Sequence, residues 1–229
     1  MTYGLIIAAG NQSRFKLETP KALVTIGERS LLDDNIRKMK TVCDDVFVVC
    51  STTNSHYFDG YNTIVIESGM GCGDAVYRAA KSLGSLSSDD YLFIQWGDSS
   101  VDEELYREMI CVYAGKMVIP CKVEAKPYVR IVRNKTGGAN VLFSKYGEKV
   151  SRGFHDLSVF LINAHDLMRS SQEFVDKFFN GVSYEHPHGN EFQFLDLLND
   201  TDLKCTVYST VYNGFSFNTV EEMIKLGKR

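Results

Sequence analysis

The sequence predicts an α/β protein: a Rossmann-like three-layer domain whose central sheet is mixed but mostly parallel, with a small antiparallel insertion. Two observations predict it. In the first half, short and nearly continuous apolar runs alternate with amphipathic stretches, which is typical of parallel strands covered by helices on both faces. From about Tyr128, strand-like segments follow one another and are joined by turn residues such as those of 134–138, which is typical of antiparallel pairing.

The predicted elements can be justified in chain order. Strands are expected where apolar runs are continuous or alternate, and helices where apolar residues recur with a helical period. Helical spacing returns after the insertion. The expected strands are Tyr3–Ala8, Asp45–Cys50, Thr63–Ile66, Tyr91–Gln95, Lys116–Pro120, Tyr128–Arg133, Ala139–Phe143 and Leu157–Ile162, and the expected helices are Leu31–Thr41, Gly73–Ser82, Glu103–Tyr113, Ala164–Asn180, Glu191–Leu198 and Val220–Leu226.

Composition bounds the domain organisation and the possible partners. A chain of 229 residues, 44% of them hydrophobic, can bury a full core, and we expect a single domain over 1–229. The formal charge of −4 gives no field for holding nucleic acid. No basic leader precedes the first apolar run and no run reaches membrane-spanning length, so we expect a cytoplasmic protein without membrane insertion. A homodimer is left open.

The cysteines and histidines give weaker signals. The six cysteines show no C-x-x-C pair and no zinc-ligand spacing, and four lie in apolar or strand-like runs, which favours small buried side chains in a reducing compartment. His186 and His188 are separated by one proline. A solvated loop is the simpler interpretation of that pair, and a metal site is the alternative.

The segment after the first strand has the composition of a phosphate-binding turn. Small residues let backbone N–H groups approach phosphate oxygens, and a following helix adds its positive N-terminal end. Arg14 can grip phosphates as a fork, and Lys21, seven residues later, acts as a point charge. A generic strand-to-helix turn with two surface cations is the alternative. The residues expected to line the phosphates are Ala8, Ala9, Gly10, Asn11, Gln12 and Ser13.

Asp98 follows the apolar strand that ends at Gln95. In an open α/β sheet ligands bind at the carboxyl ends of strands, and a carboxylate there can hold Mg²⁺. Capping of the next helix is the alternative. Asn218 precedes Glu221 by three residues, the spacing of a helix N-cap with a capping box, and that structural explanation suffices by itself.

These motifs resemble the signature of the nucleotidyltransferase family that includes sugar-nucleotide pyrophosphorylases and cytidylyltransferases. Its usual form is Leu-Ala-Ala-Gly-x-Gly-x-Arg-Met, then Pro-Lys-x-Leu; Ile7 through Arg14 fill the first part, and 20–23 the second. Gln12 replaces the second glycine of the loop. The resemblance implies that Asp98 and Asn218 bind Mg²⁺, because the family has a metal-binding Asp in a strand-Gly-Asp setting and ends in a similar Asn/Asp-Thr-x-Glu-Glu segment.

A glycine-rich segment, 68–76, resembles the family's Gly-Thr-Gly-x-Ala element, which faces the nucleobase. Glycines let main-chain groups contact a planar ring closely. Gly69 stands where uridylyl- and thymidylyltransferases usually carry Gln, so CTP is favoured over UTP. Asp74 is equally explained as a first-turn acid that favours the helix dipole. The residues expected to contact the nucleotide here are Ser68, Gly71, Gly73 and Asp74, of which Asp74, Ser68 or a backbone carbonyl would recognise the cytosine amino group.

The acceptor side, 126–229, departs further from the family than the nucleotide-binding half, 1–125. Residues 128–132 resemble its Tyr-Gly-Arg-Ile-Val strand, with Val129 in place of glycine, and Asp156 stands where the family's Asn-Thr-Gly has its amide. A carboxylate there suits an ammonium group, so we expect a phosphorylated amino compound or an unusual sugar phosphate; an ordinary surface Asp is the alternative. Trp96, Tyr128 and Asp156 are expected to contact the acceptor.

The resemblance implies a Mg²⁺-dependent reaction in which an acceptor phosphate attacks the α-phosphorus of a nucleoside triphosphate and pyrophosphate leaves, as in the synthesis of surface polysaccharide or lipid precursors. Arg14 and Lys21 would be its catalytic cations. A glycosyltransferase is the competing enzyme class, but Ser100 takes the second position of the Asp-x-Asp that such enzymes normally show. A non-catalytic nucleotide-binding module is the third alternative.

Overall fold

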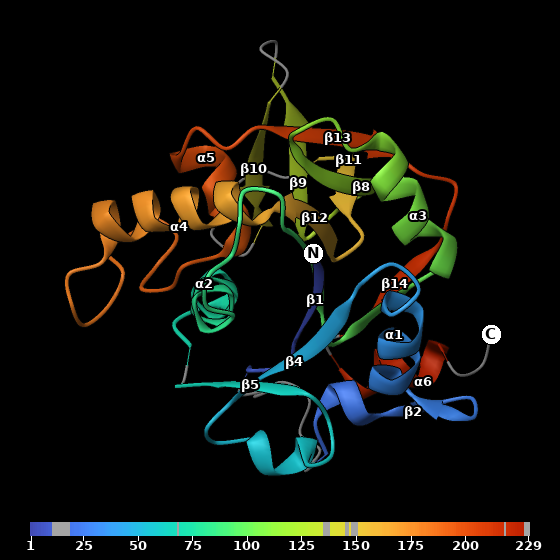
Figure 1. The fold of residues 1–229 in the computed structure, drawn as a ribbon. Coiled ribbons are helices and arrows are strands. Elements are labelled where there is room, and N and C mark those ends of the chain that lie inside the picture. The colour runs from blue at the N-terminus through green and yellow to red at the C-terminus, as the bar shows by residue number, and fades with distance from the viewer. Residues whose placement is uncertain are drawn as a thin grey trace.

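The computed structural model describes residues 1–10, 19–67, 69–134, 138–144, 147, 151–217 and 219–226. Within them, a ten-stranded sheet runs through the molecule, with helices on both sides (Figure 1). Its order is β10-β9-β11-β8-β12-β6-β1-β4-β5, and β13 pairs with β8. The bounds are β1 Thr2–Ile7, β4 Asp45–Ser51, β5 Thr63–Ile66, β6 Tyr91–Trp96, β8 Met117–Glu124, β9 Val129–Arg133, β10 Ala139–Phe143, β11 Gly153–Asp156, β12 Val159–Asn163 and β13 Cys205–Ser209.

The N-terminal half forms the parallel part of this sheet. β1 lies between β4 and β6 and is parallel to both, and β4 is parallel to β5. Leu5 and Ile6 of β1 point to opposite faces and are both 0% exposed, which explains the continuous apolar run of a strand covered on both faces. Ile7, the last residue of β1, is in register with Val49 and Trp96, so the carboxyl ends of three strands meet at one edge.

The C-terminal half supplies antiparallel strands to the same sheet. β12 pairs antiparallel with β6, and β11 pairs antiparallel with both β8 and β9. β9 and β10 form the antiparallel pair expected around the turn at 134–138. The predicted fold class is confirmed. The antiparallel segment extends the main sheet at the end opposite β5, so the strands of the C-terminal half are continuous with those of the N-terminal half.

Helices cover the two faces in two groups. On one face α2, α4 and α5 pack on a core that includes Leu92, Ile94 and Phe160. On the other, α1 and α3 pack on a core that includes Ile6 and Phe93; Figure 1 shows α2 and α4 across the sheet from α1 and α3. The helices are α1 Leu31–Met39, α2 Cys72–Ser82, α3 Glu103–Val112, α4 Ala164–Phe178, α5 Leu197–Asp200 and α6 Val220–Leu226, and short 3-10 turns are η1 Lys21–Leu23, η2 Ser55–Phe58 and η4 Phe194–Asp196.

Two small sheets complete the fold. β2 (Thr25–Ile26) pairs with β3 (Arg29–Ser30), and β7 (Ser99–Val101) pairs antiparallel with β14 (Gly214–Ser216). The second pair brings the C-terminal segment beside the strand end that carries Asp98. Asp98 does not cap the following helix, because α3 begins at Glu103 with Asp102 as its N-cap.

The prediction of a helix over Glu191–Leu198 is wrong. Residues 191–193 are not helical, η4 spans Phe194–Asp196, and α5 spans Leu197–Asp200, so only the last two residues of the predicted helix are α-helical. The reason is tertiary: the N–H of Phe192 donates to the carbonyl of Met70 (2.7 Å), and its own carbonyl accepts from Gly73 N (2.8 Å). Both backbone groups are therefore already paired outside any helix. β11 and β13 were not predicted.

The predicted burial of four cysteines is confirmed. Cys43, Cys50, Cys121 and Cys205 are buried, Cys72 is half-buried and Cys111 is exposed, and all six are free thiols. Burial raises the pKa of the Cys205 thiol to about 11. Among the described residues, no helix combines the length and apolar character needed to cross a membrane.

Candidate functional site

The candidate site begins where β1 and β6 end side by side. Gly97 follows β6, and its N–H donates to the carbonyl of Ile7 (2.9 Å). A Cβ at Gly97 would lie 3.0 Å from that oxygen and 3.4 Å from the Cβ atoms of Ala8 and Ala22. The glycine therefore lets the Asp98 turn lie directly against Ala8 and the start of the first loop.

Lys21 and Asp98 form an ion pair across these two strand ends. Lys21 Nζ lies 3.2 Å from Asp98 Oδ2, and their side chains are 10% and 30% exposed. Lys21 stands in η1, whose neighbour Ala22 is buried in the core, so the Pro-Lys-Ala-Leu turn fixes the lysine backbone. The structure thus brings together two of the residues predicted from distant parts of the sequence.

A buried polar network fixes the turn that carries Asp98. The carbonyl of Ser99, the next residue, accepts from Asn35 Nδ2 (2.7 Å) on α1 and from Gln95 Nε2 (3.1 Å) on β6. Tyr106 of α3 donates its hydroxyl to Gln95 Oε1. Asn35, Gln95 and Tyr106 are all fully buried. These buried hydrogen bonds connect the turn to two helices and a strand and so hold Asp98 in place, while Asn35 Oδ1 has no partner among the described residues.

The C-terminal segment reaches the same turn. Phe217 is fully buried, and its N–H donates to the carbonyl of Asp98 (3.2 Å). Asn218, the residue after it, lies outside the described residues, as do Asn11, Gln12, Ser13, Arg14 and Ser68. The predicted roles of these six residues stay predictions. Ala8, Ala9 and Gly10 lie in the described turn after β1, where their role in phosphate binding likewise stays a prediction.

The glycine-rich segment packs against Phe192. Gly71 has φ +102°, and a Cβ there would overlap the Phe192 carbonyl, while a Cβ at Gly73 would lie 2.5 Å from the Phe192 ring. With the two backbone hydrogen bonds between Phe192 and this segment, these contacts explain both glycines by packing. Contact of Gly71 and Gly73 with a nucleotide is not tested by this geometry.

Asp74 is 2% exposed, and both of its carboxylate oxygens are hydrogen-bonded within the protein. Oδ2 accepts from Met70 N (3.1 Å) and Arg78 Nε (2.8 Å), and Oδ1 accepts from the hydroxyl of Tyr184 (2.8 Å). Burial and this hydrogen bond raise the pKa of Tyr184, which therefore stays protonated as the donor. Asp74, in the first turn of α2, therefore anchors the glycine-rich segment through the N–H of Met70.

Trp96 and Asp156, which are predicted to contact the acceptor, are linked through Ser158. The N–H of Trp96 donates to the carbonyl of Ser158 (3.0 Å), and the N–H of Ser158 donates to Asp156 Oδ1 (2.9 Å). Asp156 is 5% exposed, and within the described residues its Oδ2 has no hydrogen-bond partner. Ser158 has φ +62°, a left-handed conformation that costs a non-glycine residue about 1–2 kcal/mol.

Tyr128 directly precedes β9 and is 46% exposed. Its neighbour Val129 offers a carbonyl to His155 Nδ1 (3.1 Å), and a carbonyl only accepts, so that nitrogen carries the proton. His155 precedes Asp156 on β11. The ring of Trp96 packs edge-on against Phe194 (5.8 Å between centroids) and at a tilt against Phe160 (5.4 Å), so segment 192–194 supports both the glycine-rich segment and Trp96.

The interpretation of His186 and His188 as a solvated loop is wrong. Their side chains are 3% and 14% exposed, and both face Asp196, which is 0% exposed. His188 Nδ1 lies 2.7 Å from Asp196 Oδ1, and His186 Nε2 lies 3.0 Å from Asp200 Oδ2. Burial raises the pKa of the Asp196 carboxyl, and its bond to His188 opposes part of that shift. The carboxylate partners, Asp196 and Asp200, come later in the chain, and a short-range sequence pattern does not indicate such contacts.

Sequence reasoning missed three supporting residues: Phe192, Asn35 and Ser158. The signal for Asn35 was a polar residue on the apolar stripe of α1, where it is 0% exposed. For Ser158 the signal was its place at the family's glycine in Asn-Thr-Gly. Phe192 gave no local signal, because its role depends on two glycines far away in the sequence.

Comparison with known proteins decides the family. Residues 4–145 match the model of the MobA-like NTP transferase domain. The chain belongs to this family. A curated relative, the bifunctional protein GlmU of Wolbachia sp. subsp. Brugia malayi, is 25% identical over 195 residues, which are 80% of this chain but 46% of GlmU. The chain therefore spans about half the length of that relative.

Two solved structures illustrate the shared fold of this MobA-like domain. The CTP:phosphocholine cytidylyltransferase LicC of Streptococcus pneumoniae has a TM-score of 0.73 at 15% identity, over 99% of this chain and 98% of its own. The inositol-1-phosphate CTP transferase of T. maritima has a TM-score of 0.73 at 13% identity, over 100% and 95% of the two chains. The predicted family and the nucleotidyltransferase class of the domain are confirmed.

Proposed function

We propose that this chain transfers a nucleotidyl group from a nucleoside triphosphate, CTP in preference to UTP, to a phosphorylated small molecule and releases pyrophosphate. The observation that carries the proposal is the Lys21–Asp98 pair at the joined ends of β1 and β6 (3.2 Å). It lies at the carboxyl ends of parallel strands, the edge at which open α/β sheets bind their ligands.

The chemistry asks the protein for alignment and charge neutralisation, because the acceptor phosphate is already an anion and needs no general base. Lys21 is positioned to stabilise the negative charge that builds up around the α-phosphate as the acceptor oxygen approaches. Arg14 would hold the β- and γ-phosphates, and the main chain of 8–13 would donate N–H groups to phosphate oxygens. Donors fixed before the reaction do not have to reorganise during it, which is why the buried support of this edge matters.

The donor set suits Mg²⁺. Asp98 offers hard carboxylate oxygens, of which Oδ2 pairs with Lys21 while Oδ1 has no hydrogen-bond partner among the described residues. Phe217, bonded to the Asp98 carbonyl, directly precedes Asn218, whose amide oxygen is a second hard ligand. Asp98 and Asn218 would hold the ion, which supplies Lewis-acid charge at the phosphates when bound.

The preference for CTP rests on the glycine-rich segment. Asp74 uses both carboxylate oxygens for Met70, Arg78 and Tyr184, so it supports the segment that would face the base. We propose that Ser68 and main-chain carbonyls of 69–73 accept from the cytosine amino group, which uracil lacks. The two solved relatives whose names specify CTP agree with this choice of nucleotide.

The acceptor proposal rests on Asp156 and Trp96. A buried carboxylate with one oxygen unpaired among the described residues suits a cationic group such as an ammonium, through a charge-assisted hydrogen bond. Trp96 is linked to Asp156 through the backbone of Ser158, and its half-buried indole ring would add an aromatic face. We therefore propose a phosphorylated amino compound, with Tyr128 contributing a further aromatic surface. Phosphocholine, the compound in the name of LicC, is also a phosphorylated cation, but its quaternary nitrogen has no N–H and would use only the charge and the aromatic face.

The test is pyrophosphate release with Mg²⁺, using CTP, UTP, dTTP, GTP and ATP against phosphorylated amines, inositol phosphate and sugar 1-phosphates. We expect turnover to be fastest with CTP and a phosphorylated amine. Lys21→Ala should lower kcat by about 10²–10³, as for loss of one preorganised donor. Lys204→Ala, at an exposed lysine, is the control and should be unchanged. Transfer from a nucleotide sugar without pyrophosphate release would instead favour a glycosyltransferase, and binding without turnover a non-catalytic module.

A further inference from the structure

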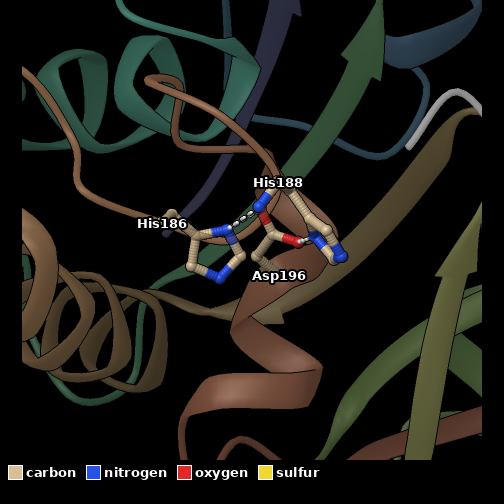
Figure 2. A group of neighbouring side chains, drawn as sticks. All are labelled: His186, His188 and Asp196. Carbon is tan, nitrogen blue, oxygen red and sulfur yellow. Dashed lines mark hydrogen bonds and ion pairs between the residues drawn. The ribbon is translucent and has the colours of Figure 1, made fainter. Parts of the chain in front are cut away.

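A second cluster of titratable side chains lies outside the proposed catalytic site. His186 and His188 come from the loop after α4, and Asp196 from η4 (Figure 2). Each offers one ligand atom, and the three atoms all lie within 4.8 Å of one another. This cluster takes no part in the proposed nucleotidyl transfer.

Hydrogen bonds fix His186 in a coordinating tautomer. Its Nε2 lies 3.0 Å from Asp200 Oδ2, so Nε2 carries the proton. Its Nδ1 is therefore unprotonated, and its lone pair accepts the backbone N–H of His188 at 3.1 Å, a hydrogen bond that a metal ion would replace. A carboxylate that holds the distal N–H of an imidazole is the arrangement commonly found behind metal-binding histidines, because it orients the ring and increases its basicity.

Two acceptor atoms face each other in this cluster. His186 Nδ1 and Asp196 Oδ2 are 3.7 Å apart. Ligand atoms around a tetrahedral zinc ion lie about 3.3 Å apart, given bonds close to 2.0 Å. His188 Nδ1, 2.7 Å from Asp196 Oδ1, lies on the same carboxylate. Small side-chain shifts would therefore place three ligand atoms around one ion.

The surroundings favour a cation here. Asp196 is 0% exposed, and rings of Phe174 and Phe178 lie 5.3 and 4.7 Å from the His186 ring, while Phe143 lies 5.0 Å from the His188 ring. Lys177 pairs with Asp200 (3.2 Å), whereas Asp196 has no lysine or arginine partner among the described residues. Asp196 Oδ2 also accepts the N–H of Gln193 at 3.2 Å, and a metal ion would stabilise this buried carboxylate further.

We propose that His186, His188 and Asp196 bind one zinc ion, with Asp200 holding His186 in its coordinating tautomer. Two imidazoles and a carboxylate are borderline ligands that suit Zn²⁺ better than Mg²⁺. The ion would replace two hydrogen bonds, the one from His188 N–H to His186 Nδ1 and the one between His188 Nδ1 and Asp196 Oδ1. His188 Nδ1 gives up its proton on binding, to Nε2 where the ring is neutral and to solvent where it is protonated, so the bound ring is neutral. Three protein ligands leave the fourth position to water.

The site would tie the loop after α4 to η4. Phe192, just before η4, packs on Gly71 and Gly73, and Phe194 in η4 packs on Trp96, so zinc bound at η4 would stabilise the surface that supports the glycine-rich segment. The inference does not depend on the proposed reaction, because zinc binding is measured on the resting protein.

The experiment uses the full chain, stripped with chelator, in a Cys111→Ser background that removes the exposed thiol. Equilibrium dialysis with ZnCl₂ should give one zinc per chain, and Co²⁺ should give the absorption of a tetrahedral site. His188→Gln should abolish this binding and the rise in Tm that zinc gives. Asp200→Asn should weaken it by about 10–100-fold. His165→Gln, at an exposed histidine of α4, should leave it unchanged.

Three results would overturn the proposal. The first is the absence of stoichiometric zinc. The second is zinc that persists in His188→Gln and disappears in Asp98→Asn, which would place the ion at the strand ends. The third is thiolate or all-oxygen ligation of zinc, measured by X-ray absorption in the protein with its histidines unaltered. The proposal requires two imidazole ligands in that spectrum, and the measurement decides the question even where the histidine variants do not fold.

Discussion

The proposed nucleotide side and the proposed acceptor side of the candidate site are built differently. On the nucleotide side, Lys21 of η1 pairs with Asp98, and the buried side chains of Asn35 and Gln95 fix the turn that carries Asp98. On the acceptor side, Asp156 is held by one backbone N–H, and Tyr128 is 46% exposed. The nucleotide side is a supported electrostatic framework, whereas the acceptor side depends on a few individual side chains.

The difference teaches where this domain can vary. Charge neutralisation at phosphates is the same task for every member of the reaction class, and it needs donors that do not move. Recognition of the acceptor changes with its chemistry and needs only a small number of contacts. Substitutions on the nucleotide side should therefore affect turnover with all acceptors, and substitutions on the acceptor side should affect the choice among them.

The strongest challenge to this division is Phe192, which belongs to the acceptor half by sequence but packs on Gly71 and Gly73. Phe192→Ala should lower the free energy of unfolding by about 3–5 kcal/mol, as expected for a fully buried phenylalanine, and should raise the KM for the nucleotide more than that for the acceptor. Chemical denaturation and steady-state kinetics measure the two effects. Phe192→Leu, which keeps most of the volume, serves as the control. A Phe192→Ala protein with normal stability and normal nucleotide KM would show that the contact does not support the nucleotide side.

The sequence predicted the residues of the nucleotide side better than those that support them. Gly97-Asp98 is a local pattern whose position follows from the end of the strand before it, whereas Pro20-Lys21 is a local pattern that lies at the 3-10 turn η1, well after β1. The 3.2 Å pairing of Lys21 and Asp98 depends on which strands are neighbours, and that is a property of the whole sheet. The helix predicted around Phe192 is absent for the same reason: its backbone partners, Met70 and Gly73, are distant in sequence.

The C-terminal half was harder to predict. Cys205–Ser209 forms a strand only because β8 offers a parallel partner, and Gly153–Asp156 has no apolar alternation to mark it. The sequence predicts His186 as an ordinary loop residue, because only the folded chain brings Asp200 and the ring of Phe174 beside it. In each case a long-range contact supplies the stabilisation, and local propensity is a weak guide to such contacts.

Asp156→Asn sharpens the comparison from the acceptor side. The variant removes the charge that we propose binds an ammonium group, while the amide oxygen still accepts from Ser158 N. Loss of a charge-assisted hydrogen bond costs about 1.5–3 kcal/mol, so the KM for a phosphorylated amine should rise roughly ten- to a hundredfold. The KM for CTP should stay unchanged. Asp202→Asn, at an exposed position, is the matched control. An unaltered KM for the amine in Asp156→Asn would remove Asp156 from the acceptor site.

A pH experiment on Cys205 tests whether the acceptor half unfolds together with the rest. Burial raises the pKa of this thiol to about 11, whereas an unfolded cysteine ionises at about 8.5. Its contribution to stability is therefore complete below pH 8.5. It is lost between about pH 8.5 and 11, at about 1.4 kcal/mol per pH unit, because only the unfolded state releases the proton.

The slope of unfolding free energy against pH should accordingly be shallower in Cys205→Ala than in the unaltered chain over that window. Denaturation curves at several pH values measure it. Cys111→Ala, which removes the exposed cysteine, should keep the original slope. Equal slopes in all three proteins would mean that β13 detaches before the transition that the denaturation curves report.

The smallest expected effect comes from Ser158, which joins Asp156 to Trp96 and has φ +62°. Glycine adopts this conformation freely, so Ser158→Gly relieves about 1–2 kcal/mol of strain but loses about 0.4–1 kcal/mol through its more flexible unfolded chain. The net gain should be below about 1 kcal/mol in thermal or chemical unfolding. Ser158→Ala keeps the strain and should show no gain. If Ser158→Gly is more stable but has a higher acceptor KM, the strained serine contributes to binding. If both values are those of the unaltered chain, the hydrogen bond from Ser158 N to Asp156 already offsets the strain, and the acceptor side is more rigid than its few contacts indicate.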